Sequence, residues 1–206
     1  MPDARLSSPA VLRNREPLLD VLRRVLPARA LVLEIASGSG EHAVFFAEHL
    51  PQHTFQPTEA DATKLASVAA WRGASPLPNL LAPVRLDVCE TPWPVERADA
   101  ILCINMIHAS PWESTPALFD GAARILPEGG RVLTYGAYKI GGAHTAESNV
   151  AFDRWLREDR DPRWGVRDLE AVVDVARERG LTHVESISMP ANNFVQVFER
   201  RSTTTR

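Results

Sequence analysis

The sequence lacks long hydrophobic runs, dense clusters of positive charge and, apart from two residues, cysteine. None of its apolar stretches reaches the ~18 residues that a membrane-spanning helix needs, so we expect no contact with a membrane. Its 23 Lys and Arg are outnumbered by 26 Asp and Glu, so the net charge gives no reason to expect a nucleic acid partner. The N-terminus carries no basic-then-apolar segment typical of a secretory signal. We therefore expect a cytoplasmic protein.

Cysteine and histidine are too few and too scattered to suggest disulfides or a metal site. Cys89 and Cys103 fall on predicted strands that are not neighbours, so we interpret both as reduced thiols in the core. No Cys or His pair has the spacing of metal ligands, and we expect no metal. The partner that we expect is a small-molecule substrate.

The length and the 45% hydrophobic content are typical of one globular domain over residues 1–206. Within it we expect an N-terminal helical extension over 1–28 and a flexible tail over 201–206. Residues 139–167 interrupt the pattern of the chain and are predicted to form a lid-like insertion. We expect a monomer or a homodimer.

The most informative stretch runs from Leu31 to His42. A run of β-forming residues ends at Glu34-Ile35, breaks into the turn Ala36-Ser37-Gly38-Ser39-Gly40, and leads directly into a helix-like segment. A buried strand that feeds a glycine turn at a helix N-terminus is typical of nucleotide-binding α/β proteins. Because glycine has no Cβ, such a turn lets a ligand approach the backbone closely.

Strand-like and helix-like segments alternate along the rest of the chain. Strands are predicted at 31–35, 54–57, 83–88, 98–105, 131–136, 182–188 and 193–199. Only four residues join the last two, which requires an antiparallel hairpin. The predicted fold is therefore α/β, with a mostly parallel sheet that ends in an antiparallel hairpin.

Some expectations concern single residues. Pro17 is expected to restart the N-terminal helix at its first position, and Thr145 is expected to cap a helix within the insertion. Trp155 on that second helix is expected to belong to the core, whereas His42 is expected to be exposed on the helix that follows the glycine turn.

Two kinds of cofactor fit the glycine turn. The spacing Gly38-x-Gly40-x-x-Ala43, with Glu59 at a suitable distance for a ribose, matches a relaxed dinucleotide fingerprint and supports a nicotinamide enzyme. Three details favour S-adenosylmethionine: Glu34 ahead of the glycines, Asp87-Val88 after the third strand, and the antiparallel finish. Its sulfonium, ammonium, ribose and adenine groups suit carboxylates at strand ends. Glu59 is expected to accept both ribose hydroxyls, and Asp87 the adenine amine.

Several segments resemble known families. Val32 to Gly40 resembles motif I of class I methyltransferases and departs from it at Ala36, where that pattern prefers glycine. Five others are similar to the little-characterised methyltransferase-like protein 26 family: Arg13-Asn14-x-Glu16-Pro17, Phe55-Gln56-Pro57-Thr58, His144-Thr145-x-Glu147-Ser148-Asn149-x-x-Phe152-Asp153, Asp161-Pro162-x-Trp164-Gly165-x-Arg167-Asp168 and Met189-Pro190-Ala191-Asn192-Asn193. The resemblance implies a Rossmann-like seven-stranded, mostly parallel sheet of order 3-2-1-4-5-7-6, with strand 7 antiparallel and helices on both faces. It also implies S-adenosylmethionine as the cofactor, but it supplies no substrate.

The predicted cofactor site combines the turn with the ends of neighbouring strands. Its members are Glu34, Ala36, Gly38, Gly40, Glu59, Asp87, Val88 and Asn105. Methyl transfer needs an aligned acceptor and, for some acceptors, a base. His108, which follows the fourth strand, is a candidate base or acceptor-orienting residue, or a loop histidine with a structural hydrogen bond. Tyr138, Asn192 and Asn193 are the other catalytic candidates, although packing or turn roles also fit them.

We expect the residues that contact the acceptor to lie in the insertion and near the N-terminus. The candidates are Asn14, His144, Glu147, Asn149, Trp164 and Arg167. The sequence thus predicts an S-adenosylmethionine-dependent methyltransferase that acts on a small polar molecule. A nicotinamide-dependent oxidoreductase and a catalytically silent S-adenosylmethionine-binding protein remain alternatives.

Overall fold

The structure is a computed structural model that describes residues 3–201. The predicted flexible tail lies, apart from Arg201, outside the described residues, as do the first two residues. Hydrogen-bonded neighbours give one seven-stranded sheet of order β3-β2-β1-β4-β5-β10-β9. Here β9 and β10 are the predicted sixth and seventh strands, and β10 is antiparallel to both neighbours. The predicted α/β fold and sheet order are confirmed.

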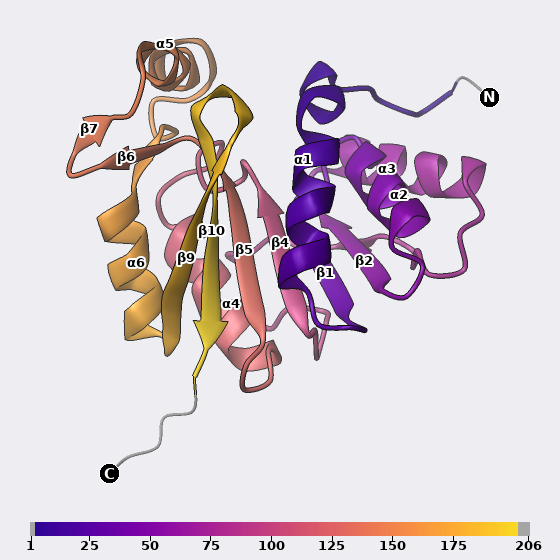
Figure 1. The fold of residues 1–206 in the computed structure, drawn as a ribbon. Coiled ribbons are helices and arrows are strands. Elements are labelled where there is room, and N and C mark those ends of the chain that lie inside the picture. Colours follow the sequence, from indigo (N-terminus) through magenta and orange to yellow (C-terminus); the bar gives the residue numbers. More distant parts are fainter. Residues whose placement is uncertain (1–2, 202–206) are drawn as a thin grey trace. The chain divides into compact units, whose positions relative to one another are not determined.

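The chain divides into two compact units, residues 1–102 and 103–206, with the boundary inside β4 (Ala100–Ile104). Unit 1 contains the elements α1 (Pro9–Val25), β1 (Leu31–Ile35), α2 (Glu41–His49), β2 (Thr54–Glu59), α3 (Ala62–Ala74) and β3 (Val84–Arg85). Figure 1 shows α1 running alongside β1 within this unit. The apolar face of α1 is buried through Leu18, Leu19 and Leu22, as the helical spacing of these leucines predicts.

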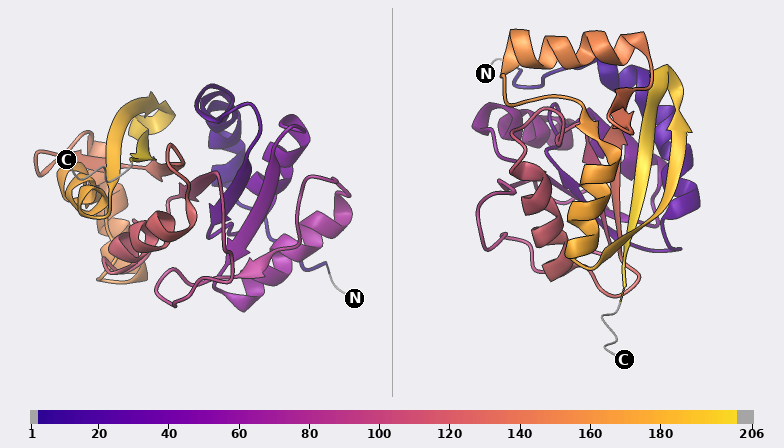
Figure 2. Two further views of the ribbon diagram at one scale, coloured as in Figure 1. Left: turned by 90° about the horizontal axis from the view of Figure 1, so that it is seen from below. Right: turned by 90° about the vertical axis from the view of Figure 1, so that its left-hand side faces the viewer.

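Unit 2 contains the elements α4 (Ser114–Ile125), β5 (Arg131–Gly136), β6 (Tyr138–Ile140), β7 (Ala143–His144), α5 (Glu147–Trp155), a π-helical turn (Leu156–Arg160), β8 (Arg167–Asp168), α6 (Leu169–Glu178), β9 (Leu181–Met189), a short 3₁₀ turn (Pro190–Asn192) and β10 (Asn193–Arg200). Helices α4 and α6 lie on the same side of the β9–β10 hairpin (Figure 2). Phe119 on α4 packs edge-on against Phe198 on β10, with ring centroids 5.0 Å apart.

In unit 1, two neighbouring parallel strands each carry a buried carboxylate at or near the carboxyl end. β1 pairs in parallel with β2, with Glu34 opposite Pro57. Val32 to Ile35 are all buried, as expected for a parallel strand covered on both faces. The carboxyl ends of both strands therefore carry Glu34 and Glu59 into the same neighbourhood of the unit. β3, by contrast, has two residues instead of the predicted six and lies at the edge of the sheet.

Several expectations about single residues are wrong. Pro17 lies inside an unbroken α1, so it does not restart the helix. The N-cap of α5 is Ala146, whereas the hydroxyl of Thr145 accepts a hydrogen bond from Asn149. Trp155 is 40% exposed, and its ring contacts Arg160 and Phe152 of the same helical segment. Cys103 is buried as expected, but Cys89 is exposed.

The insertion contains structure that the alternation of strands and helices did not predict. β6 pairs with both β7 and β8 in a separate three-stranded sheet. Each of these strands has two or three residues, which is too short to produce a recognisable period. Helix α5 lies across the end of unit 2 at which β9 turns into β10 (Figures 1 and 2). That the chain is a single domain with a lid-like insertion stays a prediction.

Gly40 is predicted to be required for the packing of α3 on the glycine turn. A Cβ at this position would lie 2.7 Å from Cα of Val68, and its φ of +94° is unfavourable for a side chain. Gly40→Ala should therefore lower the free energy of unfolding by roughly 2–4 kcal/mol. The control is Gly73→Ala within α3, where a Cβ meets open space, and which should gain up to about 1 kcal/mol. Equal denaturant midpoints for the two variants would contradict this account.

Candidate functional site

The glycine turn of unit 1 alternates between right- and left-handed backbone. Ala36, Gly38 and Gly40 have φ values of +54°, +60° and +94°. A left-handed conformation at Ala36 costs roughly 1–2 kcal/mol, which the surrounding hydrogen bonds offset. The backbone N–H of Ser37 donates to the carbonyl of Thr58 at 2.8 Å. The turn is therefore tied to the end of β2.

Glu59 holds this turn from β2. Its side chain is buried and accepts three backbone N–H groups. Oε1 accepts from Ala60 at 3.0 Å and from Asp61 at 3.1 Å, and Oε2 accepts from Gly38 at 2.9 Å. A carboxylate oxygen has two lone pairs, so only Oε2 keeps a free acceptor position. In this arrangement Glu59 can accept one ribose hydroxyl, not the predicted two.

Glu34 is the second buried carboxylate of the turn. Its Oε2 accepts the hydroxyl of Ser37 at 2.6 Å, while its carbonyl accepts the hydroxyl of Thr58 at 2.7 Å. Burial raises the pKa of Glu34 to about 7, the Ser37 hydrogen bond opposes this shift, and the charge of Glu59 adds to it. A cation beside Glu34 would favour its ionised form. Ser37 and Thr58 were missed as site residues, although hydroxyls next to predicted strand-end carboxylates are a usable signal.

Gly38 has open space where a side chain would stand. A Cβ at this position would meet no heavy atom within 4 Å. The backbone of Gly38 is therefore open to close approach on this side, and its part in binding a ligand stays a prediction.

Asp87 and Val88 follow the short β3 in the same unit. Oδ1 of Asp87 accepts the N–H of Cys89 at 2.9 Å, and the side chain is half-buried. Val88 is buried, and its carbonyl accepts the indole N–H of Trp93 at 3.1 Å. The bond to Cys89 fixes the Asp87 carboxylate and leaves Oδ2 available for a donor such as an adenine amine.

Asn14 has a structural partner in unit 1. Its Oδ1 lies 2.8 Å from Nε2 of His42, and both side chains are buried. The expectation that His42 is exposed is therefore wrong, because this hydrogen bond joins α2 to α1. Burial lowers the pKa of His42 to about 4, so its ring is neutral at physiological pH.

In unit 2, Asn105 and His108 form a tight loop after β4. Asn105 is left-handed, with φ of +61°, and its carbonyl accepts the N–H of His108 at 3.0 Å. His108 is fully buried, and its Nδ1 accepts the N–H of Arg167 at 3.3 Å. The neutral ring therefore carries its proton on Nε2, an atom without a protein partner among the described residues. Burial, and then the charge of Arg167, lower the pKa of His108 to about 3. Nε2 is itself buried and the ring is neutral, which disfavours a general base, and a role for His108 in orienting an acceptor stays a prediction.

Tyr138 is buried against the same histidine. Its hydroxyl lies 2.6 Å from Oγ1 of Thr134, and its ring packs edge-on against His108 with centroids 4.9 Å apart. Burial raises the pKa of Tyr138 above its usual range. These contacts agree with the packing alternative that the sequence left open.

Arg167 holds the loop that carries His108. Its guanidinium donates to the carbonyl of Ile107 at 2.8 Å and to that of Ser110 at 2.5 Å. The side chain is buried, with the Trp112 ring 5.6 Å from its central carbon. In this arrangement Arg167 shapes the loop, and pairing with a substrate carboxylate stays a prediction.

The other candidates of the insertion lie around Asp153 and around the β9–β10 turn. Nε2 of His144 is 3.4 Å from Oδ2 of Asp153. Oδ1 of the same carboxylate accepts the backbone N–H of Val166. Trp164 is half-buried, whereas Glu147 is exposed in the first turn of α5.

Asn149 is buried and joins α5 to the turn between β9 and β10. It donates to the carbonyl of Asn192 at 3.0 Å, and Asn192 donates to Oγ of Ser148 at 3.2 Å. Asn193 donates to the carbonyls of Pro190 and Ala191, which closes its own turn. These bonds agree with turn roles for both asparagines, and their catalytic roles stay predictions.

Two features are absent from residues 3–201. No helix there is both long and apolar enough to cross a membrane. Likewise, no group of three or more His, Cys, Asp and Glu side chains in that range is arranged to hold a metal ion.

Comparison with known proteins gives a family and a fold. The family model "Protein of unknown function (DUF938)" matches residues 5–200. An O-methyltransferase family protein from Burkholderia thailandensis has a TM-score of 0.79 at 18% identity, over 94% of this chain and 58% of that one. A putative sarcosine dimethylglycine methyltransferase from Galdieria sulphuraria has a TM-score of 0.73 at 16% identity, over 96% and 92%.

A third similar structure is CalO1, a methyltransferase in calicheamicin biosynthesis, in its SAH-bound form. Its TM-score is 0.70 at 18% identity, over 90% of this chain and 54% of CalO1. The chain thus spans less than two thirds of the length of CalO1 and of the Burkholderia protein. At these identities the likeness shows the fold.

Glu34→Gln is predicted to remove a pH-dependent loss of stability. The pKa of Glu34 is about 7 in the folded chain against an ordinary value of 4.5, so folding favours the protonated form. Its contribution is therefore fully present below pH 4.5 and is lost as the pH rises through 7, by at most about 3 kcal/mol. Gln keeps an acceptor for Ser37, so unfolding free energies of the variant and the unaltered chain should diverge between pH 5 and 8 in favour of Gln.

The comparison between variant and unaltered chain isolates this carboxyl. The buried His42 and His108 have lowered pKa values and lose stability as the pH falls below 6.5, but they do so equally in both proteins. Glu48→Gln, an exposed position on α2, is the matched control. A pH-independent difference for Glu34→Gln would contradict a buried, partly protonated Glu34.

His108 is predicted to stay neutral, with its proton on Nε2, throughout pH 5–8. Nitrogen-15 spectra of histidine rings, assigned by comparison with a His108→Gln variant, measure both the tautomer and the protonation state. Protonation of the His108 ring with a midpoint between pH 5 and 7 would restore the general-base interpretation.

Proposed function

The chain belongs to the DUF938 family, and we propose that it is an S-adenosylmethionine-dependent methyltransferase that acts on a small polar acceptor. The observation that carries the proposal is the glycine turn of unit 1, with its open space at Gly38 and the buried carboxylates of Glu34 and Glu59. The sheet order, and the fold that the chain shares with known methyltransferases, support it.

The residues of the turn suit the chemical groups of this cofactor. Glu34 would supply negative charge to a cationic ligand in a buried setting, where such attraction is strong. Glu59 would accept one ribose hydroxyl on Oε2 while its other bonds keep the turn in shape. Asp87 would accept the adenine amine on Oδ2, and Val88 would pack beside the ring. Gly38 would provide close backbone approach, while Ala36 and Gly40 would keep the turn in its left-handed shape.

When bound, the cofactor supplies a methyl group that is already activated by its sulfonium. The chain then has to orient an acceptor and exclude water. For His108 to donate from Nε2–H to the acceptor, binding would have to expose this atom, which is buried in the structure, and Asn105 would position the loop that carries it. The neutral ring does not take a proton in this arrangement, so the acceptor would need a lone pair that is available at neutral pH.

The finer predictions belong to this proposal. They are the resemblance to the methyltransferase-like protein 26 family, the small polar acceptor, the lid-like role of residues 139–167, the monomeric or dimeric state and the cytoplasmic location. Acceptor contacts from Asn14, His144, Glu147, Asn149, Trp164 and Arg167, and catalytic roles for Tyr138, Asn192 and Asn193, are likewise proposed.

Gly38→Val is predicted to abolish binding of S-adenosylhomocysteine, because the valine side chain would fill the space that a ligand needs. Isothermal titration calorimetry measures the affinity. Gly129→Val in unit 2 is the matched control, since Gly129 also has a positive φ of +76° and open space at its Cβ position. It carries the same backbone strain and should leave the affinity unchanged.

The same titrations separate the alternative functions. Binding of NAD(P) and not of S-adenosylhomocysteine by the unaltered chain would favour an oxidoreductase. Binding of S-adenosylhomocysteine with no methylated product in a broad screen of metabolites would favour a catalytically silent binding protein. Equal affinity of Gly38→Val and the unaltered chain would place the cofactor away from this turn.

A further inference from the structure

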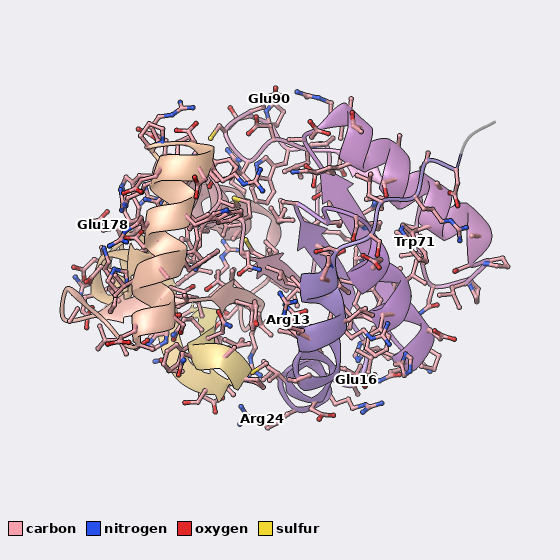
Figure 3. All side chains as sticks on the ribbon, turned by 90° about the horizontal axis from the view of Figure 1, so that it is seen from above. Arg13, Glu16, Arg24, Trp71, Glu90 and Glu178 are labelled. Carbon is pink, nitrogen blue, oxygen red and sulfur yellow. The ribbon has the colours of Figure 1, made fainter. Side chains whose placement is uncertain are left out.

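Residues 3–8 form a strap that lies on α3 of unit 1. The N–H of Leu6 donates to Oγ of Ser67 at 2.7 Å, and the indole N–H of Trp71 donates to the carbonyl of Leu6 at 2.7 Å. The guanidinium of Arg5 lies 5.1 Å from the centre of the Trp71 ring. Figure 3 shows Trp71 on α3, close to this N-terminal segment. The strap is therefore held by side chains of α3 and not by a strand partner.

Glu41 ties the same strap to the start of α2. Its Oε2 accepts the N–H of Ser8 at 2.7 Å, and its Oε1 accepts the hydroxyl of Ser7 at 3.1 Å. The same Oε2 accepts the hydroxyl of Ser39 at 2.8 Å. One carboxylate thus bridges the strap and the glycine turn.

A second bridge reaches the same turn residue. Ser67, which is fully buried, donates its hydroxyl to the carbonyl of Ser39 at 2.7 Å while it accepts from Leu6. Ser39 stands between Gly38 and Gly40, and both bridges from the strap end on it. Its side chain is held through Glu41 and its carbonyl through Ser67.

We propose that Glu41 and Ser67 are positioning residues that couple docking of the strap to cofactor binding at the glycine turn. The inference rests on the proposed function, because it takes the turn as the cofactor site. With the strap docked, Ser39 has one orientation and Gly38 presents its open side to the ligand. With the strap released, Glu41 and Ser67 lose their hydrogen bonds from Ser7, Ser8 and Leu6, so they hold Ser39 less firmly. The glycines on either side of Ser39 then permit other backbone conformations.

The strap can release without unfolding unit 1. Its residues are mostly exposed, and the Asp3–Arg5 ion pair is solvated and contributes little. A segment with few buried apolar contacts opens at low free energy. Coupling between two sites is reciprocal, so the cofactor must stabilise the docked strap as much as the strap favours the cofactor.

The test measures both directions of this coupling. Glu41→Ala and Ser67→Ala should each weaken binding of S-adenosylhomocysteine by about tenfold in calorimetry, within the usual range of coupling between sites. Glu41→Gln keeps one acceptor oxygen and should restore part of the affinity. In hydrogen exchange of the unaltered chain, S-adenosylhomocysteine should slow the amides of Leu6 and Ser8.

Glu48→Ala, an exposed position on the same helix, is the matched control and should bind as the unaltered chain does. Thermal unfolding identifies a variant that fails to fold, and the exchange measurement needs no variant. If the unaltered chain binds S-adenosylhomocysteine but Leu6 and Ser8 exchange as before, or if Glu41→Ala and Ser67→Ala bind normally, the coupling is overturned. If the unaltered chain does not bind it, the proposed function fails and the coupling fails with it.

Discussion

The geometry of unit 1 depends on two buried carboxylates, one at the end of each neighbouring parallel strand. Glu59 uses three of its four acceptor positions for backbone N–H groups, one of them that of Gly38. Glu34 accepts the hydroxyl of Ser37. An unpaired buried carboxylate is costly, so the turn and its acids stabilise each other. The left-handed residues of the turn are kept in place by this network, and the open side of Gly38 follows from it.

In unit 2, a buried polar side chain likewise fixes a loop, the one that carries His108. Arg167 donates to two carbonyls of the 107–110 loop, and its own N–H sets the tautomer of His108. The sequence suggested a base, an acceptor-orienting residue or a structural histidine at this position, and burial beside a guanidinium keeps the ring neutral. Chemistry that needs no proton removal by the protein agrees with this environment.

The sequence predicted the strands and the antiparallel hairpin because strand-end acids, helix stops and a four-residue link are local signals, whereas the sheet order came from the resemblance to class I methyltransferases. The sequence did not predict features that depend on contacts between residues far apart in the chain. His42 is buried beside Asn14 of another helix, and Trp155 is 40% exposed with only Arg160 and Phe152 of its own helical segment against its ring. The three short strands of the insertion give no period. The role of Ser67 depends on contacts with Leu6 and Ser39, which are distant in sequence.

The central claim is that the glycine turn between Glu34 and Glu59 seats an S-adenosyl cofactor. A crystal structure of the chain with S-adenosylhomocysteine tests it most directly. The account predicts ligand density against the backbone of Gly38, with one ribose hydroxyl within hydrogen-bond distance of Oε2 of Glu59. Density elsewhere on the chain, or a ribose that displaces the Gly38 N–H from Glu59, would contradict it.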